Sequence, residues 1–171
     1  MEKHTNVVYR ETQRPRQILW WVLILLPATF MWYWFIQQII NGVPVGNKPA
    51  PDVVTIIFWA IFGIVFPVFM LGLSKLIIEV LNDGLYIRFV PFHFKYKQYL
   101  FKDIRHYESI TYSPLKRFGG WGTRINFKGE MVYNINGKKG IELRLRNNTV
   151  VVGTRKPDEL KKALELVQRT Q

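Results

Sequence analysis

The chain has 171 residues, with 24 Lys and Arg against 12 Asp and Glu and a formal net charge of +12 at pH 7. This length suits one modest domain with an accessory segment and excludes two full-sized domains. Because the chain contains no cysteine, disulfide scaffolds, zinc ribbons, thiol nucleophiles and cysteine-ligated clusters are also excluded.

Two blocks of the sequence are apolar and uncharged. Residues 17–47 and 53–74 contain no Asp, Glu, Lys or Arg. A helix needs roughly 20 apolar residues to cross the hydrocarbon core of a bilayer. The sequence therefore predicts transmembrane helices over residues 18–40 and 53–75. The first block is longer than the apolar region of a cleaved signal peptide, so we expect it to be retained as an anchor.

The first apolar block contains an aromatic cluster, Trp32, Tyr33 and Trp34. Such rings favour the interface between membrane and water, but these three lie well inside the block. The sequence leaves two positions open for them: the interface, or the surface of the second helix.

The positive charges around the two helices predict their orientation. Basic residues lie in the N-terminal segment 1–17 and again after the second helix, whereas the connector 41–52 contains Lys48 as its single basic residue. Cytoplasmic loops carry the excess of Lys and Arg in membrane proteins. We therefore expect a multi-pass protein of the cell (inner or plasma) membrane, with both termini cytoplasmic and residues 41–52 forming an external connector.

Residues 76–171 show the short periods and turn signals of an all-β domain, which we expect to be cytoplasmic. An Asn-Asp-Gly sequence between two apolar runs predicts a β-hairpin. Alternation predicts a further strand over 92–100 with one buried and one wet face. In all, about seven strands are predicted, which favours a small barrel or sandwich: 76–81, 85–91, 92–100, 104–112, 124–127 with 131–135, 141–146 and 149–152.

A final amphipathic helix is predicted to begin at Pro157. Proline is favoured at the first helical position, and the acidic residues that follow it suit the positive end of the helix dipole. Leu160, Ala163, Leu164 and Val167 share one face. We expect this face to cap an open end of the barrel.

Strands followed by one C-terminal helix form the arrangement of the pleckstrin-homology fold. The chain resembles the bacterial pleckstrin-homology-like membrane proteins, mostly uncharacterised, in which a two-helix anchor precedes such a domain. The resemblance is carried by EVLNDGLYIRF at 79–89, YSPLKRFGGWGTR at 112–124 and GTRKPDEL at 153–160. It implies fold and topology, whereas function depends on the surface of each member. The basic cluster with which eukaryotic members bind inositol phosphates is missing from the hairpin at residues 82–84.

Candidate binding residues are basic or aromatic side chains near glycines or alternating strands: Lys116, Arg117, Trp121, Arg124, Lys95 and Lys97. Three glycines around Trp121 permit unusual backbone shapes, and the neighbouring cations supply hydrogen-bond donors. The segment 116–124 is interpreted either as a loop that touches a membrane or peptide, or as a structural turn whose tryptophan plugs a barrel end.

Catalysis, metal and nucleic acid are weakly indicated. His4, His93 and His106 are far apart in the sequence and lack metal-ligand spacing, so no metal site and no cofactor are predicted. No nucleophile accompanies an acid–base pair, so we expect no enzymatic activity. The basic residues are interspersed with acidic ones and match no nucleic-acid-binding motif, so we expect no nucleic-acid partner.

Two functions follow as hypotheses. The first is a non-enzymatic membrane protein whose cytoplasmic module, held beside the inner leaflet, binds a protein partner or associates with itself through strand edges. The second is recognition of anionic lipid headgroups by the basic face and the segment 116–124, since each Lys or Arg near an anionic surface contributes about 1 kcal/mol.

Overall fold

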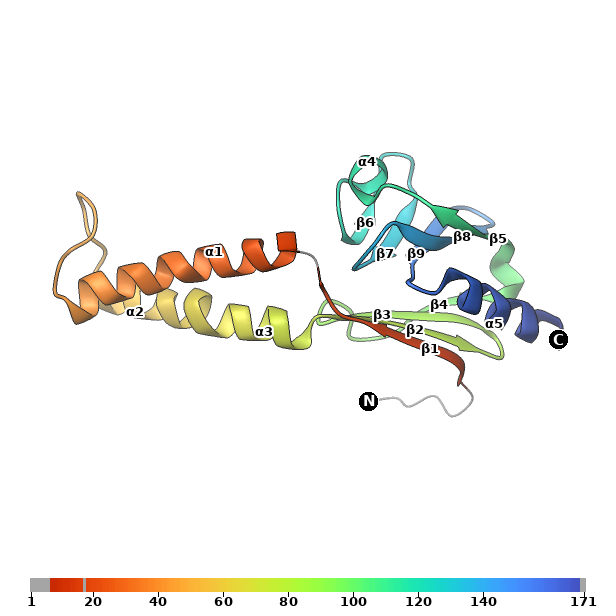
Figure 1. Ribbon diagram of the computed structural model, residues 1–171, viewed down its shortest axis with the longest axis horizontal. Coiled ribbons are helices and arrows are strands. Elements are labelled where there is room, and N and C mark those ends of the chain that lie inside the picture. Colours follow the sequence, from red (N-terminus) through yellow and green to blue (C-terminus); the bar gives the residue numbers. More distant parts are fainter. Residues whose placement is uncertain (1–6, 17, 170–171) are drawn as a thin grey trace. The chain divides into compact units, whose positions relative to one another are not determined.

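The computed structural model describes residues 7–16 and 18–169, and the chain divides into two compact units (Figure 1). One unit comprises Arg16–Ser74 and is helical. The other unit combines the strand that precedes the helices with the chain from Lys75 onward. The polypeptide thus leaves the β unit for the helices and then returns to it.

The helical unit contains two apolar stretches that pack side by side (Figure 1). The first is α1 (Ile18–Phe35) with the π-helical turn η1 (Ile36–Ile40). The second runs through α2 (Asp52–Phe58), the π-helical turn η2 (Trp59–Val65) and α3 (Phe66–Leu73). Both are long and apolar enough to cross a membrane, as the sequence predicts. The second stretch ends before the predicted boundary at 75, because Lys75 already belongs to a strand.

Contacts within the helical unit decide the position of one ring of the aromatic cluster. Pro67 has no N–H and so cannot donate to the carbonyl of Gly63 one turn earlier. The indole Nε1 of Trp32 donates to this carbonyl oxygen at 3.1 Å. The Trp32 ring also meets the Trp59 ring edge to face, with centroids 5.1 Å apart. Trp32 therefore packs on the second stretch, one of the two positions that the sequence left open.

The first sheet of the β unit has four strands in the order β1-β2-β3-β4, with antiparallel neighbours. Their bounds are β1 (Val7–Gln13), β2 (Lys75–Leu81), β3 (Gly84–Val90) and β4 (Lys97–Leu100). β2 and β3 form the predicted hairpin around the Asn-Asp-Gly turn, which confirms that sequence signal.

Strand β1 corrects the prediction that residues 1–17 lie outside the β domain. It pairs along β2 from Val7 opposite Leu81 to Gln13 opposite Leu76. The sequence concealed this strand because the side chains that it buries, Glu11 and Gln13, are polar. Gln13 Nε2 donates to the carbonyl of Gly153 at 2.8 Å. The predicted domain of residues 76–171 therefore lacks one strand of its own sheet.

The predicted strand over residues 92–100 is wrong in its first half. Only Lys97–Leu100 form a strand, β4, and the preceding residues form a turn. The alternating aromatics at 92 and 94 are not a buried face, since Phe92 is 54% and Phe94 89% exposed. The alternation here reflects an irregular loop in which Phe92 stacks on Phe89 with centroids 5.4 Å apart.

The second sheet has five strands in the order β5-β8-β9-β7-β6. Their bounds are β5 (Ile104–Thr111), β6 (Gly122–Ile125), β7 (Met131–Asn134), β8 (Lys139–Leu145) and β9 (Thr149–Gly153). The 3-10 turn η3 (Phe101–Asp103) leads from β4 into β5.

The pairing in this sheet differs from a succession of hairpins. β7 and β9 are parallel, whereas β5 with β8, β8 with β9 and β6 with β7 are antiparallel. Both sheets are open, with edge strands β1 and β4 in the first and β5 and β6 in the second. The described residues thus form two open sheets where the sequence predicts a barrel of about seven strands.

Helix α5 (Pro157–Arg169) follows the second sheet and lies on the β unit (Figure 1). Its four predicted apolar residues are buried, which confirms the amphipathic pattern. They join side chains of both sheets in one core, to which β2 contributes Leu76, Ile78 and Val80. Along β9, Val150 and Val152 enter this core while Val151 faces a second cluster on the other side of the sheet.

Candidate functional site

The candidate binding residues fall into two groups in the structure. Lys116 and Arg117 lie on the short helix α4 (Pro114–Phe118), with Trp121 and Arg124 a few residues further on. Lys95 and Lys97 belong to the other sheet, in the β3–β4 connection and at the start of β4.

Helix α4 forms because its ends are capped. Ser113 precedes Pro114, and the Ser113 hydroxyl accepts from the backbone N–H of Lys116 at 3.5 Å. At the other end Gly119 adopts φ +70°, and its N–H donates to Leu115 O at 3.0 Å. The underside of the helix is fixed by Phe118, which is buried against Tyr112. The first glycine of the run, Gly119, thus ends helix α4.

Trp121 is held at the surface of the second sheet. Its side chain is neither fully exposed nor part of the buried core. The indole Nε1 donates to Gly137 O at 3.4 Å, and Arg124 Nε donates to the Trp121 carbonyl at 2.9 Å. These contacts attach the ring to the β7–β8 turn, so the predicted plug of a barrel end is not observed.

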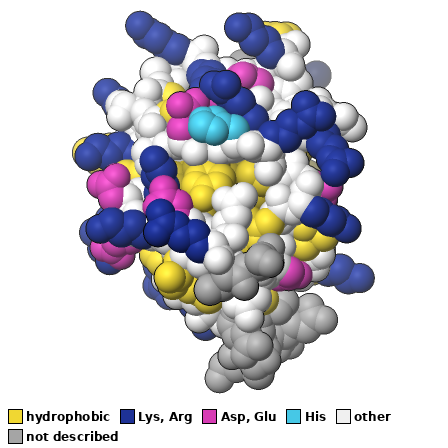
Figure 2. All heavy atoms as spheres, turned by 90° about the vertical axis from the view of Figure 1, so that its right-hand side faces the viewer, with side chains coloured by type: hydrophobic (Ala, Val, Ile, Leu, Met, Phe, Trp, Pro, Cys, Tyr) yellow, Lys and Arg dark blue, Asp and Glu magenta, His cyan; other side chains and the backbone are white. Residues whose placement is uncertain are grey.

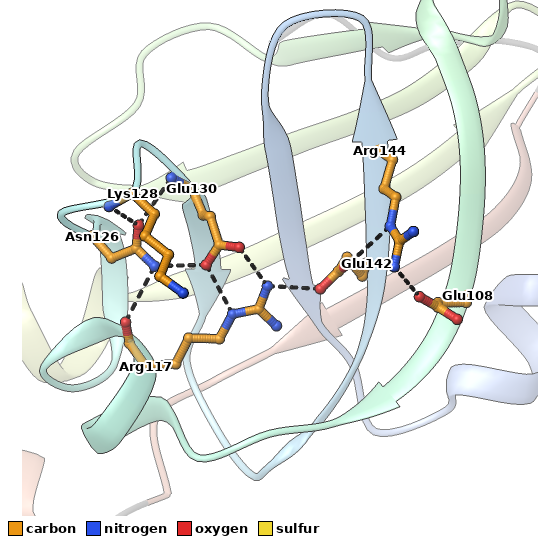
Figure 3. A network of polar contacts seen from close by, with 7 residues as sticks. All are labelled: Glu108, Arg117, Asn126, Lys128, Glu130, Glu142 and Arg144. Carbon is orange, nitrogen blue, oxygen red and sulfur yellow. Dashed lines mark hydrogen bonds and ion pairs between the residues drawn. The ribbon is translucent and has the colours of Figure 1, made fainter.

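Arg117 lies at the centre of a network of polar contacts (Figure 3). Its guanidinium meets both carboxylate oxygens of Glu130, with Nε at 3.0 Å from Oε2 and Nη2 at 2.9 Å from Oε1. The same Nη2 donates to Glu142 Oε2 at 2.7 Å. The hydrogen bond to Glu130, and after it the hydrogen bond to Glu142, raise the pKa of Arg117 above its ordinary value.

The network continues on both sides of Arg117. Glu142 also accepts from Arg144 at 3.3 Å, and Arg144 donates to Glu108 at 2.9 Å, so the ion pairs cross from β8 to β5. On the other side, Asn126 donates to Glu130 at 2.6 Å. The hydrogen bond from Arg117, with that from Asn126, holds the pKa of Glu130 below its ordinary value, despite partial burial.

This geometry changes the role expected for Arg117. A guanidinium that is bidentate to one carboxylate and bonded to a second has its donors directed at the protein itself. Arg117 therefore fixes the β6–β7 turn against β8 and α4. The sequence could not show this, because Glu130 and Glu142 are 13 and 25 residues away.

An open groove of about 410 Å³ lies beside this network. Its rim carries Lys116 from α4 and Phe127 and Lys128 from the β6–β7 turn. Phe127 is fully exposed, and Leu115 on α4 is 56% exposed. We call Leu115, Lys116, Phe127 and Lys128 the α4 surface. It combines apolar side chains with cations on a backbone that Arg117 and Asn126 hold in place.

Of the α4 surface, the sequence indicated only Lys116 as a candidate binding residue. Phe127 was assigned to the end of a strand, whereas β6 ends at Ile125 and Phe127 lies in the turn. Asn126 shapes that turn, since its Oδ1 accepts from the N–H groups of Lys128 and Glu130 at 2.9 and 3.0 Å. One sequence signal could have indicated an exposed aromatic side chain here. Phe127 lies between Asn126 and Lys128, two polar residues of the kind that is usual in a turn.

The histidines that the structure describes serve local roles. His93 Nδ1 lies 3.4 Å from the N–H of Phe89, and burial lowers the pKa of His93, helped by Lys97. His106 Nε2 lies 3.9 Å from Glu108. His4 lies outside the described residues. Among residues 7–16 and 18–169, no group of three or more His, Asp or Glu side chains is arranged to hold a metal ion.

On the face drawn in Figure 2, the charged side chains are distributed rather than gathered. Figure 2 shows Lys and Arg side chains around the rim of one face, with Asp and Glu among them and apolar side chains toward the middle. Nucleic-acid-binding surfaces concentrate cations in a patch or stripe. The face in Figure 2 does not have that distribution.

These observations define a class of protein in which two apolar helical stretches are inserted, in the sequence, between the first and second strands of a β unit with two open sheets. Within that class, the chain belongs to the family of unknown function DUF6141, whose family model matches residues 1–167. No curated protein and no solved structure matches the chain.

Proposed function

We propose that this chain is a non-enzymatic integral membrane protein that presents a cytoplasmic protein-binding module beside the inner leaflet. The two apolar stretches are the proposed membrane spans. Strand β1 precedes the first stretch and pairs with β2, which follows the second. Paired strands must lie on one side of a bilayer, so both termini of a spanning hairpin share that side. The positive flanking charges favour the cytoplasm for it.

The proposed relation to pleckstrin-homology-like domains concerns the β unit alone. A four-stranded antiparallel sheet, a second sheet and a C-terminal amphipathic helix around one core support this relation. The parallel β7–β9 pair and the strand supplied from before the first span are the departures from a simple succession of strands.

The observation that carries the binding function is the α4 surface. Exposed apolar side chains grouped with polar ones are typical of an interaction surface. Phe127 and Leu115 offer apolar contact, while Lys116 and Lys128 favour acidic groups on the partner. Strand β6, which leads into this turn, lies at the edge of the second sheet, and sheet edges are where partner strands add. The partner is therefore a protein segment with apolar and acidic side chains, a second copy of the chain included.

Photo-crosslinking in intact membranes tests this proposal. A photoreactive phenylalanine analogue replaces Phe127 in the full chain, and the same analogue replaces Leu166, which is 60% exposed on α5, as the matched control. We expect a discrete protein adduct from position 127 and none from position 166. The double substitution Lys116→Glu and Lys128→Glu is expected to abolish that adduct. An adduct with lipid alone would favour the headgroup hypothesis, and equal adducts at both positions would refute a specific surface.

A further inference from the structure

The β3–β4 loop, residues 91–96, projects from one particular end of the first sheet. The register places Gln13 of β1 opposite Leu76, and Lys75 of β2 opposite Val90 of β3. The last residue of β1, the first of β2 and the last of β3 thus lie at the same end. The loop begins directly after Val90.

That same end of the sheet is where the chain enters and leaves the two apolar stretches. Only Ser74 separates Leu73, the last residue of α3, from Lys75. Two residues of chain span at most about 7 Å, and paired strands lie about 5 Å apart. Val90 is therefore within about 12 Å of the end of the second stretch. By chain connectivity, the loop that follows Val90 therefore begins close to the end of a proposed membrane span.

The loop is held in shape by its own contacts. The His93 N–H donates to Phe89 O at 2.7 Å, and Arg88 Nε donates to His93 O at 3.2 Å. The Tyr96 hydroxyl donates to the buried carboxylate of Glu79 at 3.1 Å. Such contacts fix the backbone on both sides of residue 94, so its side chain is presented without a further ordering cost.

The side chains that the loop leaves in solvent are apolar and basic. Phe94 is 89% exposed and Phe92 54%. Lys95 and Lys97 are exposed beside them. A protruding phenylalanine flanked by lysines matches the interfacial region of an anionic bilayer, where rings enter the boundary between headgroups and acyl chains while ammonium groups meet phosphates. Folding of the β unit leaves the Phe94 ring almost wholly in solvent, which is unfavourable in water and favourable at that boundary.

We propose that the loop of residues 91–96 inserts Phe94 into the bilayer interface, with Lys95 and Lys97 on anionic headgroups. This inference rests on the membrane location proposed above, and it assigns the lipid contact to a surface other than the α4 surface. It gives the two lysines the role of orienting the β unit against the leaflet. The α4 surface is then available to a protein partner.

The absence of cysteine makes a direct test simple, since any introduced cysteine is unique. A spin label is attached to Phe94→Cys in the full chain, reconstituted in nanodiscs of phosphatidylglycerol and phosphatidylcholine. Leu166→Cys, at a position that is 60% exposed on α5, is the control. We expect the label at 94 to be several-fold more accessible to oxygen, relative to a water-soluble nickel complex, than the label at 166. Equal ratios at the two positions would overturn the proposal.

The charges are tested separately. With Lys95→Glu and Lys97→Glu, the oxygen preference of the label at 94 should fall in nanodiscs that contain phosphatidylglycerol. In phosphatidylcholine alone the substitutions should have little effect. A label at 94 that is shielded from both reagents would indicate a protein contact and reject lipid insertion. The crosslink from Phe127 depends on a different surface, so its loss or survival reports on the proposed function independently.

Discussion

Removing Arg10 should destabilise the first sheet, because this residue neutralises a buried carboxylate. Glu79 on β2 is fully buried and lies opposite Arg10 on β1. Arg10 Nη2 and Nε lie 2.6 and 2.7 Å from Glu79 Oε1. The other oxygen, Oε2, has no hydrogen-bond partner within the described part of the chain. In Arg10→Met, the aliphatic contact is kept, and the hydrogen bond from the Tyr96 hydroxyl is the one that remains to the buried carboxylate within residues 7–16 and 18–169.

The size of the expected loss of stability depends on how deeply Arg10 and Glu79 are buried. Breaking a fully buried ion pair costs about 3 to 5 kcal/mol. Because the Arg10 side chain is 47% exposed, water screens part of this interaction, and we expect about 2 to 3 kcal/mol. At about 1.4 kcal/mol per factor of ten, local opening of β1 and β2 should become roughly 30- to 140-fold more frequent.

Hydrogen exchange on the full chain in nanodiscs measures this opening at the β1 and β2 amides. Arg14→Met, which removes an exposed arginine just after β1, is the matched control and should change exchange little. The decisive comparison is Arg10→Met with and without Glu79→Gln. If buried charge is the cause, the second substitution restores protection. Equal exchange in the single and double variants would refute the argument, because lost packing would then explain the effect.

Two further predictions concern the second sheet. In Gly140→Ala the added Cβ would lie 2.6 Å from the backbone oxygen of Val152, so the free energy of unfolding should fall by about 1 to 3 kcal/mol. In the control Gly72→Ala the added Cβ meets nothing within 4 Å, so this substitution should not destabilise the protein. Thermal unfolding monitored at the β unit compares the two variants. Hydrogen bonding to Arg117 lowers the pKa of Glu130 from 4.5, so Glu130→Gln should reduce the free energy of unfolding by about 1 to 2 kcal/mol at pH 7. This difference from wild type should vanish as the pH falls through the lowered pKa, because Glu130 is then protonated in both the folded and unfolded states. Chemical denaturation that gives equal losses in strong acid and at neutrality would contradict this.

The elements predicted well are those whose signals are local. Two uncharged blocks gave the helical stretches almost to the residue, because length and apolarity alone define such helices. The Asn-Asp-Gly turn gave the β2–β3 hairpin, and apolar spacing gave the buried face of α5. Each of these signals spans fewer than about 25 residues and needs no distant partner.

The errors arose where a distant partner decides the structure. β1 buries the polar side chains of Glu11 and Gln13, whose partners Thr154 and Gly153 lie 143 and 140 residues away, so no apolar alternation marks its second half. The run at 92–100 alternates like a strand, but its first half becomes a loop, in which Tyr96 bonds Glu79 and Phe92 stacks on Phe89. Periodicity records which side chains are apolar. It does not record which polar side chains find buried partners.

The candidate site shows the same division. Residue type alone singled out Lys116, Arg117 and Trp121 in the glycine-rich segment. In the fold, Arg117 pairs with Glu130 and Glu142 and so stabilises the protein itself. Phe127 lies at the same groove as Lys116.

The sequence by itself determined that the chain has two apolar helices, a hairpin and an amphipathic terminal helix, since these depend on hydrophobicity and turn chemistry over short distances. Only the tertiary structure decided that the N-terminal segment completes the first sheet and which cations remain exposed. The physical reason is that a buried polar group is stable only with a partner, and such partners can come from any part of the chain.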